Sequence, residues 1–266
     1  MNIVKETGST LFPEELIRLF IPTEKLEVSP TGLAFSAYRR NTEALVTVHL
    51  LHRTAHLAAR IGELEQLVKE RRNINVKGYV APFEVGMTEE YVYFVTPFLI
   101  GRSLTTTMNE RVCPPDLILF LTAEVSNVIG DLQGEGINHG NIRSSSIFHD
   151  GSTVQLVDLC YPQLYEEQVD DLEAVGLILK SWMEDSGIAE RLPTSMKWTF
   201  NSFLGDHKVE DGRIAAESLY SELESSLGVR AHHKAKSRKR PFINVWPPLF
   251  VASMTIGSML VAAGLG

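Results

Sequence analysis

The sequence predicts an α+β fold in which strands come first and helices follow, ended by one transmembrane helix. Short apolar segments of strand type lie between residues 26 and 97, and longer segments with helical apolar spacing begin at Pro115. After residue 240 the chain carries no charged residue and is mostly apolar. Of the 266 residues, 44% are hydrophobic and 22% are charged, a composition that suits a domain with a full core.

The first hundred residues are expected to form a small sheet with one helix. Residues 1–25 are interpreted as a lead-in, with a short helix beginning near Pro13. From residue 54 to residue 72, apolar residues recur three or four positions apart, which places them on one face of a helix. The strands expected around this helix are three between Leu26 and Leu51, followed by Tyr79–Glu84 and Tyr91–Pro97.

Helices are expected to dominate the second half of the chain. The segment Pro115–Gly134 has a proline at its first position and a glycine at its end, so it predicts a long amphipathic helix. A hairpin of two short strands is expected around Asp150 and Gly151. Residues 171–179 and 196–227 have further helical spacing.

The charge of the chain is negative except near its C-terminal end. The formal net charge is −8, which disfavours nucleic acid as a partner, because nucleic-acid binding needs a basic surface. The two cysteines, Cys113 and Cys160, offer no disulfide framework and suit a reducing compartment. Six basic residues gather in a linker at 229–241: Arg230, Lys234, Lys236, Arg238, Lys239 and Arg240.

Residues 244–265 are long and apolar enough to form a transmembrane helix, since about 20 residues span a hydrocarbon core of roughly 30 Å. The basic linker before them predicts a single-pass membrane protein with residues 1–240 in the cytoplasm. Its Lys and Arg side chains are expected to contact anionic lipid headgroups. A buried C-terminal helix of the globular domain is the alternative interpretation of this segment.

A loop and the hairpin after it resemble a motif of the protein kinases. The tripeptide His139-Gly140-Asn141 occupies the place of the kinase H-R-D, and Ser146 occupies the place of the Asn that closes this loop. One hairpin later, Asp158-Leu159-Cys160 occupies the place of D-F-G.

The chain is therefore similar to the protein kinase-like superfamily over residues 26–228, and the resemblance implies a bilobal fold. It implies a small N-lobe at 26–97, with five strands and one helix, and a mainly helical C-lobe at 101–228. In the C-lobe, Asp171 and Gly176 keep the frame of the kinase D-x-x-S-x-G-x-x-L helix.

The resemblance also implies a vestigial nucleotide pocket. Thr96 would be its gatekeeper, Leu99 would lie on the hinge beside an adenine, and Asp158 is the candidate Mg²⁺ ligand. ATP with Mg²⁺ is the ligand that such a pocket would take, although no cofactor is expected for this chain. The residues assigned to the pocket are Gly32, Glu63, Thr96, Leu99, Arg143 and Asp158.

Three positions depart from what phosphoryl transfer requires. His49 stands where kinases have the phosphate-binding Lys, and Ser146 replaces the Asn that holds the second metal ion. Asn141 replaces the catalytic Asp, and an amide has no useful basicity. The resemblance therefore implies no catalytic residues but a degenerate kinase domain.

The function implied is that of a pseudokinase tethered to the cytosolic face of a membrane. It would act as a scaffold or allosteric regulator by binding a protein partner, for which the helix at 54–72 and the activation-segment groove are candidate docking surfaces. One alternative is an unconventional serine/threonine protein kinase with residual ATP binding and phosphotransfer. The other is an unrelated structural protein tethered to a membrane.

Overall fold

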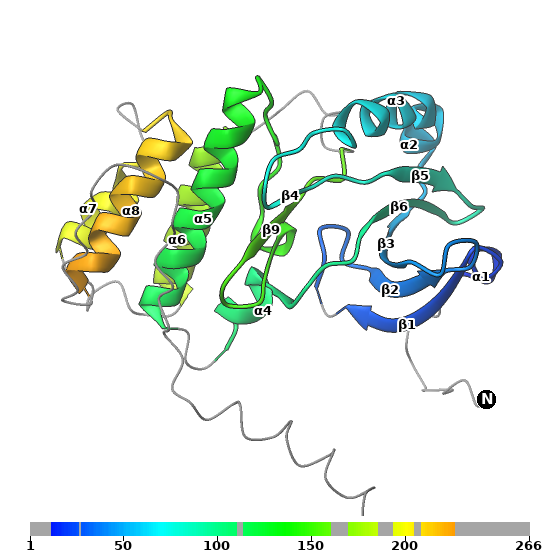
Figure 1. Ribbon diagram of the computed structural model, residues 1–266, viewed down its shortest axis with the longest axis horizontal. Coiled ribbons are helices and arrows are strands. Elements are labelled where there is room, and N and C mark those ends of the chain that lie inside the picture. Colours follow the sequence, from blue (N-terminus) through cyan, green and yellow to red (C-terminus); the bar gives the residue numbers. More distant parts are fainter. Residues whose placement is uncertain are drawn as a thin grey trace, which may run out of the picture. The chain divides into compact units, whose positions relative to one another are not determined.

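The computed structural model describes residues 12–26, 28–110, 114–160, 170–185, 194–204 and 209–226. These residues form two β-sheets and several helices, so the fold is α+β (Figure 1). All of them belong to one compact unit, Met1–Arg230.

The first sheet has five antiparallel strands in the order β1-β2-β3-β6-β5. Its central strand, β3, carries alternating side chains that point to opposite faces. Val46 and Val48 point to one face and Thr47 and His49 to the other, and all four are buried. The strands of this sheet are β1 (Phe20–Leu26), β2 (Ala34–Arg39), β3 (Leu45–His52), β5 (Glu84–Met87) and β6 (Tyr91–Pro97).

Two apolar clusters cover the two faces of this sheet, which explains why β3 is buried on both sides. Val46 and Val48 pack with Leu16 of the short helix α1 (Glu14–Ile17). On the opposite face, Phe94 of β6 packs with Leu57 and with residues of the helix that follows it. His49 lies opposite Phe94 in the register of β3 and β6, so its side chain shares this second face.

The helix expected at 54–72 is two helices, α2 (Ala55–Ala59) and α3 (Ile61–Arg71). Thr54 caps α2, since its side-chain oxygen accepts the Leu57 N–H at 3.2 Å. Arg60 separates the two helices with a backbone φ of −108°, outside the helical range. The predicted apolar face is nonetheless buried, with Leu64 and Val68 at most 3% exposed.

The second sheet has four strands in the order β4-β9-β8-β7. Its strands are β4 (Tyr79–Val80), β7 (Arg102–Ser103), β8 (Ile147–His149) and β9 (Val154–Val157). Strands β8 and β9 form the expected hairpin. Strand β4 pairs with β9 in parallel, with Tyr79 opposite Leu156, so this sheet joins segments that are far apart in the sequence.

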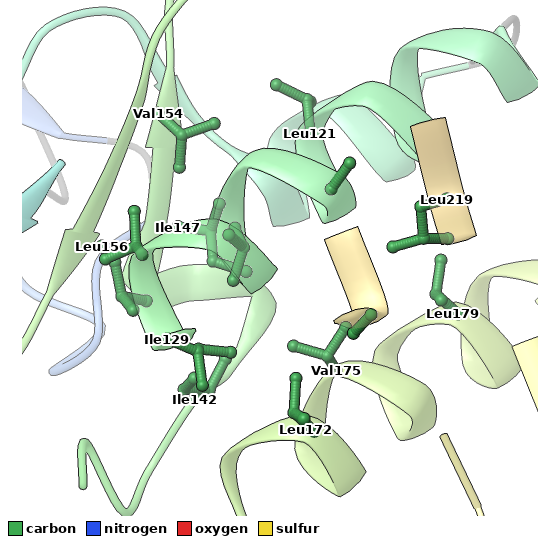
Figure 2. Packing of buried hydrophobic residues seen from close by; sticks show 14 of the residues in the cluster. Leu121, Ile129, Ile142, Ile147, Val154, Leu156, Leu172, Val175, Leu179 and Leu219 are labelled. Atoms are coloured by element: carbon green, nitrogen blue, oxygen red, sulfur yellow. The ribbon is translucent and has the colours of Figure 1, made fainter. Parts of the chain in front are cut away.

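The helical part packs on the second sheet. Helix α5 has the predicted bounds, and it lies beside α8 (Figure 1). Figure 2 shows the core that joins these elements, with Ile129 of α5, Val175 of α6, Leu219 of α8 and Leu156 of β9 among its labelled side chains. The elements are α4 (Leu104–Met108), α5 (Pro115–Gly134), the 3-10 helix η1 (Ser144–Ser146), α6 (Asp171–Asp185), α7 (Thr194–Asn201) and α8 (Gly212–Ser226).

The predicted fold class, a bilobal kinase-like fold completed by a transmembrane helix, was wrong in several respects. The five-stranded sheet begins with β1 at Phe20, inside the segment interpreted as a lead-in, and two helices accompany it in place of one. Strand β4, assigned to the N-lobe sheet, pairs with β9 of the segment interpreted as the C-lobe. The expected five-stranded N-lobe is thus matched only loosely, because a second sheet connects the two predicted lobes.

No helix within the described ranges is both long and apolar enough to cross a membrane. The predicted transmembrane segment 244–265 and the basic linker 229–241 lie outside the described residues. The same holds for the lipid contacts expected of that linker.

Candidate functional site

The loop that resembles the kinase catalytic loop is anchored by Asp171, in the first turn of α6. One carboxylate oxygen of Asp171 accepts the His139 N–H at 2.8 Å, and the other accepts the Gly140 N–H at 2.7 Å. Burial raises the pKa of Asp171, whereas the hydrogen bonds from the two backbone N–H groups act in the opposite direction. A carboxylate that accepts two backbone N–H groups holds the start of the loop in one conformation.

His139 fixes the same loop to the second sheet. Its Nε2 donates to the Val157 carbonyl oxygen of β9 at 3.0 Å, and its Nδ1 accepts the Asn141 N–H at 3.3 Å. The residue is 2% exposed. His139 therefore acts here as a structural connection between the loop and β9.

The remaining loop residues are engaged with one another. The Ser146 hydroxyl accepts the Arg143 N–H at 2.9 Å and donates to the Arg143 carbonyl oxygen at 2.8 Å. The Asn141 amide oxygen accepts from the Arg143 Nε at 2.9 Å. The structure thus brings these three predicted site residues together, with Ser146 closing a turn and with the exposed Arg143 held by Asn141.

His49 is enclosed between the first sheet and α2–α3. It is fully buried, and its Nε2 is hydrogen-bonded to the Thr96 hydroxyl at 3.2 Å. Its Nδ1 has no hydrogen-bond partner among the described residues. Burial lowers the pKa of His49 to about 3, because an apolar environment disfavours the charged imidazolium. At neutral pH this residue is uncharged and does not replace the cation of the kinase Lys.

The predicted hinge donor is used within the chain. The Leu99 N–H, which the resemblance assigns to an adenine, donates to the Thr47 hydroxyl at 3.2 Å. The next N–H, of Ile100, donates to the Gln155 side chain at 2.7 Å. Thr47 and Leu99 are 0% and 2% exposed. A side chain of β3 therefore takes the hydrogen bond that an adenine ring would need.

Asp158 is fully buried, and both of its oxygens accept hydrogen bonds. The Tyr79 hydroxyl donates to Oδ2 at 2.8 Å, and the Cys160 N–H donates to Oδ1 at 2.8 Å. Burial, together with the negative charge of Asp158, raises the pKa of Tyr79 and of the Cys160 thiol. Cys160 also has a positive φ of 65°, a region that glycine adopts most readily.

A cation missed by the sequence interpretation lies beside Asp158. Nη1 of Arg71, at the C-terminal end of α3, is 3.7 Å from Asp158 Oδ2, and Nη2 donates to the Asn138 carbonyl oxygen at 3.0 Å. The signal that could have identified Arg71 is its spacing, since it follows Leu64 and Val68 on the buried face of a helix. A charged residue in such a series indicates a buried partner.

Two predicted pocket residues, Gly32 and Glu63, form no contact with Asp158, Tyr79 or Arg71 among the interactions of the described residues. Gly32 is exposed, with a positive φ of 75°, and a Cβ atom there would contact nothing within 4 Å. Glu63 forms its ion pair with Arg60, the residue just before α3, at 2.6 Å, and this hydrogen-bonded arginine lowers the pKa of the exposed carboxyl. Gly32 therefore serves a turn between β1 and β2, and Glu63 belongs to the surface.

The sequence interpretation assigned one residue, Asp158, to a metal ion. Within the part of the chain that the structure describes, no three His, Cys, Asp or Glu side chains gather as metal ligands. The carboxylate oxygens of Asp158 are already occupied by Tyr79 and Cys160. The candidate Mg²⁺ ligand is thus engaged with donors of the chain itself, whereas Mg²⁺ takes one or two carboxylates together with several waters.

The chain was compared with known proteins. No model of a protein family matches it, and no curated protein is significantly similar to it.

Proposed function

We propose that this chain is a pseudokinase-type interaction module, which acts as a scaffold or allosteric regulator through protein contacts and does not transfer phosphate. The observation that carries the proposal is the burial of three of the six residues assigned to the pocket, Thr96, Leu99 and Asp158, together with His49 at the position of the kinase Lys. His49, Thr96, Leu99 and Asp158 are each at most 2% exposed. Thr96, the Leu99 N–H and both Asp158 oxygens form hydrogen bonds within the chain, so these residues stabilise the fold in the place where a nucleotide would bind.

The loop chemistry supports the same proposal. Phosphoryl transfer needs a base near the substrate hydroxyl and cations on the phosphates. Asn141 provides an amide in place of a carboxylate, and His49 is uncharged at neutral pH. The positive charge of Arg71 is paired with Asp158. The unconventional-kinase alternative would require these groups to exchange their present partners.

The test is nucleotide binding to the full chain, measured by thermal shift with ATP in the presence and absence of Mg²⁺. A ligand at 100 times its Kd stabilises the folded state by about 2.7 kcal/mol, which a melting curve detects. No shift at millimolar ATP is the expected result. A Mg²⁺-dependent shift that disappears in Asp158→Ala, together with phosphate transfer to a protein substrate, would overturn the proposal in favour of an active kinase.

A restoration variant sharpens this test. His49→Lys combined with Asn141→Asp returns two kinase residues, yet Leu99 and Asp158 keep their internal partners. We therefore expect neither ATP binding nor phosphotransfer to appear.

The membrane attachment and the cytoplasmic location of residues 1–240 stay predictions, because the segments that carry them lie outside the described residues.

A further inference from the structure

Exposed apolar side chains gather with arginines where α1 leads into β1 and at the end of β2. Leu19 and Ile21 are 46% and 40% exposed, while Phe20 between them is fully buried. Ile21 lies opposite Tyr38 of β2, which is 45% exposed. We call this surface the arginine patch, and it comprises Ile17, Arg18, Leu19, Ile21, Tyr38 and Arg40.

Two hollows are lined partly by residues of the arginine patch. One has a volume of about 100 Å³ and is lined by Arg18, Leu19, Phe20, Arg39, Arg40, Asn41 and Glu84. The other, of about 610 Å³, is more open and is lined by Glu14, Ile17, Arg18 and Arg40. Three arginines and one glutamate thus line the smaller hollow, in a chain whose formal net charge is −8.

The charges of these arginines are not equally balanced. Arg39 pairs with Glu84 at 2.5 Å, so its positive charge is balanced. Arg40 uses its Nε, which donates to the Ile17 carbonyl oxygen at 2.7 Å. The Arg18 side chain has no hydrogen bond or ion pair with any described residue. Two exposed guanidinium groups therefore keep donors available beside apolar side chains.

We propose that the arginine patch binds an apolar segment of a partner protein that carries an Asp or Glu side chain. A guanidinium group matches a carboxylate in a planar, two-pronged hydrogen bond, which favours arginine at interfaces. The carboxylate would enter the smaller hollow between Arg18 and Arg40, and apolar neighbours of that acid would cover Leu19 and Ile21. Such exposed apolar side chains with adjacent arginines are typical of interaction sites.

The surroundings favour a peptide over a membrane surface. Glu14 and Glu84 line the hollows, and their negative charges would face an anionic bilayer at close range. In the smaller hollow Glu84 is paired with Arg39, so a single carboxylate there would have Arg18 and Arg40 as its partners. The inference rests on the proposed interaction function, but the two can fail separately, because nucleotide binding decides the function and peptide binding decides this surface.

The experiment is selection of displayed random dodecapeptides on the immobilised full chain, followed by fluorescence anisotropy with the selected peptides. We expect these peptides to share an Asp or Glu next to apolar residues. Arg18→Gln combined with Arg40→Gln should raise their Kd by about tenfold, the effect of losing roughly 1.4 kcal/mol of binding. Replacing the acid of the peptide by its amide should produce a loss of similar size.

The matched control removes two positive charges elsewhere, by Lys69→Gln combined with Arg72→Gln on exposed positions of α3 and its end. It should leave peptide affinity unchanged. Failure to select acidic peptides, or equal binding to both double variants, would overturn the proposal. Binding to phosphatidylserine-containing vesicles that depends on Arg18 and Arg40, without peptide binding, would assign the patch to a membrane. Self-association lost in the same variant would assign it to a second copy of the chain.

Discussion

Nη1 of Arg71 lies 3.7 Å from Oδ2 of Asp158, so the cation that accompanies this buried carboxylate comes from α3 and not from β3. In the kinases that the sequence resembles, the corresponding Asp binds metal and the cation on β3 binds phosphate. Here the acid and the arginine neutralise each other inside the protein. This ion pair links α3 to the end of β9 and gives the cluster a structural role.

Removal of the Arg71 charge is predicted to destabilise the fold. Arg71→Met removes this guanidinium from the buried Asp158 carboxylate, and breaking a buried ion pair from one side costs about 3 kcal/mol or more. Urea denaturation of the full chain measures this change. In the double variant with Asp158→Asn the loss should be smaller than the sum of the single losses, since no charge is then left uncompensated.

Arg72 is the control for this prediction, because it is the next residue and its side chain is exposed. Arg72→Met should change the unfolding free energy by less than about 0.5 kcal/mol. Equal effects of the two substitutions would mean that the Arg71 charge does not stabilise the buried acid.

Stability is predicted to fall in mild acid because of His49. Burial lowers its pKa from 6.5 to about 3, so between these pH values the unfolded chain binds a proton that the folded chain does not. The contribution of uncharged His49 to the free energy of unfolding is complete above pH 6.5 and decreases as the pH falls toward 3. One such residue changes the free energy of unfolding by at most about 1.4 kcal/mol per pH unit.

His49→Leu should reduce this dependence, which denaturation at pH 6.5 and pH 5 measures. His149 contributes in the same direction, since burial and the nearby Arg102 lower its pKa to about 4, so part of the dependence remains. His52→Gln is the control on the same strand, because His52 is exposed. An unchanged slope in His49→Leu would argue against a buried, uncharged His49.

Much of the helical part could be predicted from the sequence, because its signals are local. Pro115 and Gly134 mark the two ends of α5, and the structure has the same bounds. Strand β1 was missed because Pro22 interrupts its pattern and its pairing with β2 shifts register between Pro22 and Glu24. A bulge breaks the alternation of apolar and polar residues on which strand prediction depends.

The candidate site was predictable only where it is contiguous in the chain. The positions of the loop residues from His139 to Ser146 follow from motif spacing, whereas the hydrogen bonds that Asp171 accepts from this loop appear only in the structure. The contacts of Asp158 with Arg71 and Tyr79 depend on the parallel pairing of β4 with β9. Such long-range pairing leaves no periodic signal in a single sequence, so these partners appear only in the structure.

Asp171, which holds the loop at His139 and Gly140, gives a third prediction. Asp171→Asn keeps the size of the side chain but provides one acceptor oxygen for the N–H groups of His139 and Gly140, which now bind two. One buried N–H group would then face the amide NH₂, at a cost of about 1–3 kcal/mol. Asp131→Asn is the control, because its ion pair with Arg213 is exposed and such pairs contribute about 1 kcal/mol or less. Similar losses in the two variants would contradict an anchoring role for Asp171.

The packing of α5 against α8 gives the last prediction, in which one substitution is made at two positions of the same helix. A Cβ atom at Gly130 would lie 2.7 Å from the Arg213 backbone nitrogen, whereas at Gly134 its nearest contact would be the Arg213 guanidinium at 3.6 Å. Gly130→Ala should therefore destabilise the fold by about 1–3 kcal/mol, because backbone atoms must move to relieve the overlap.

Gly134→Ala should be neutral, or stabilising by up to about 1 kcal/mol, because alanine favours the helix and fits the available space. Thermal and urea denaturation of the two variants measure the difference directly. If Gly130→Ala were as stable as Gly134→Ala, the close approach of α8 to α5 at Gly130 would be wrong. The opposite signs expected for the same chemical change make this pair a test of helix packing rather than of helix propensity.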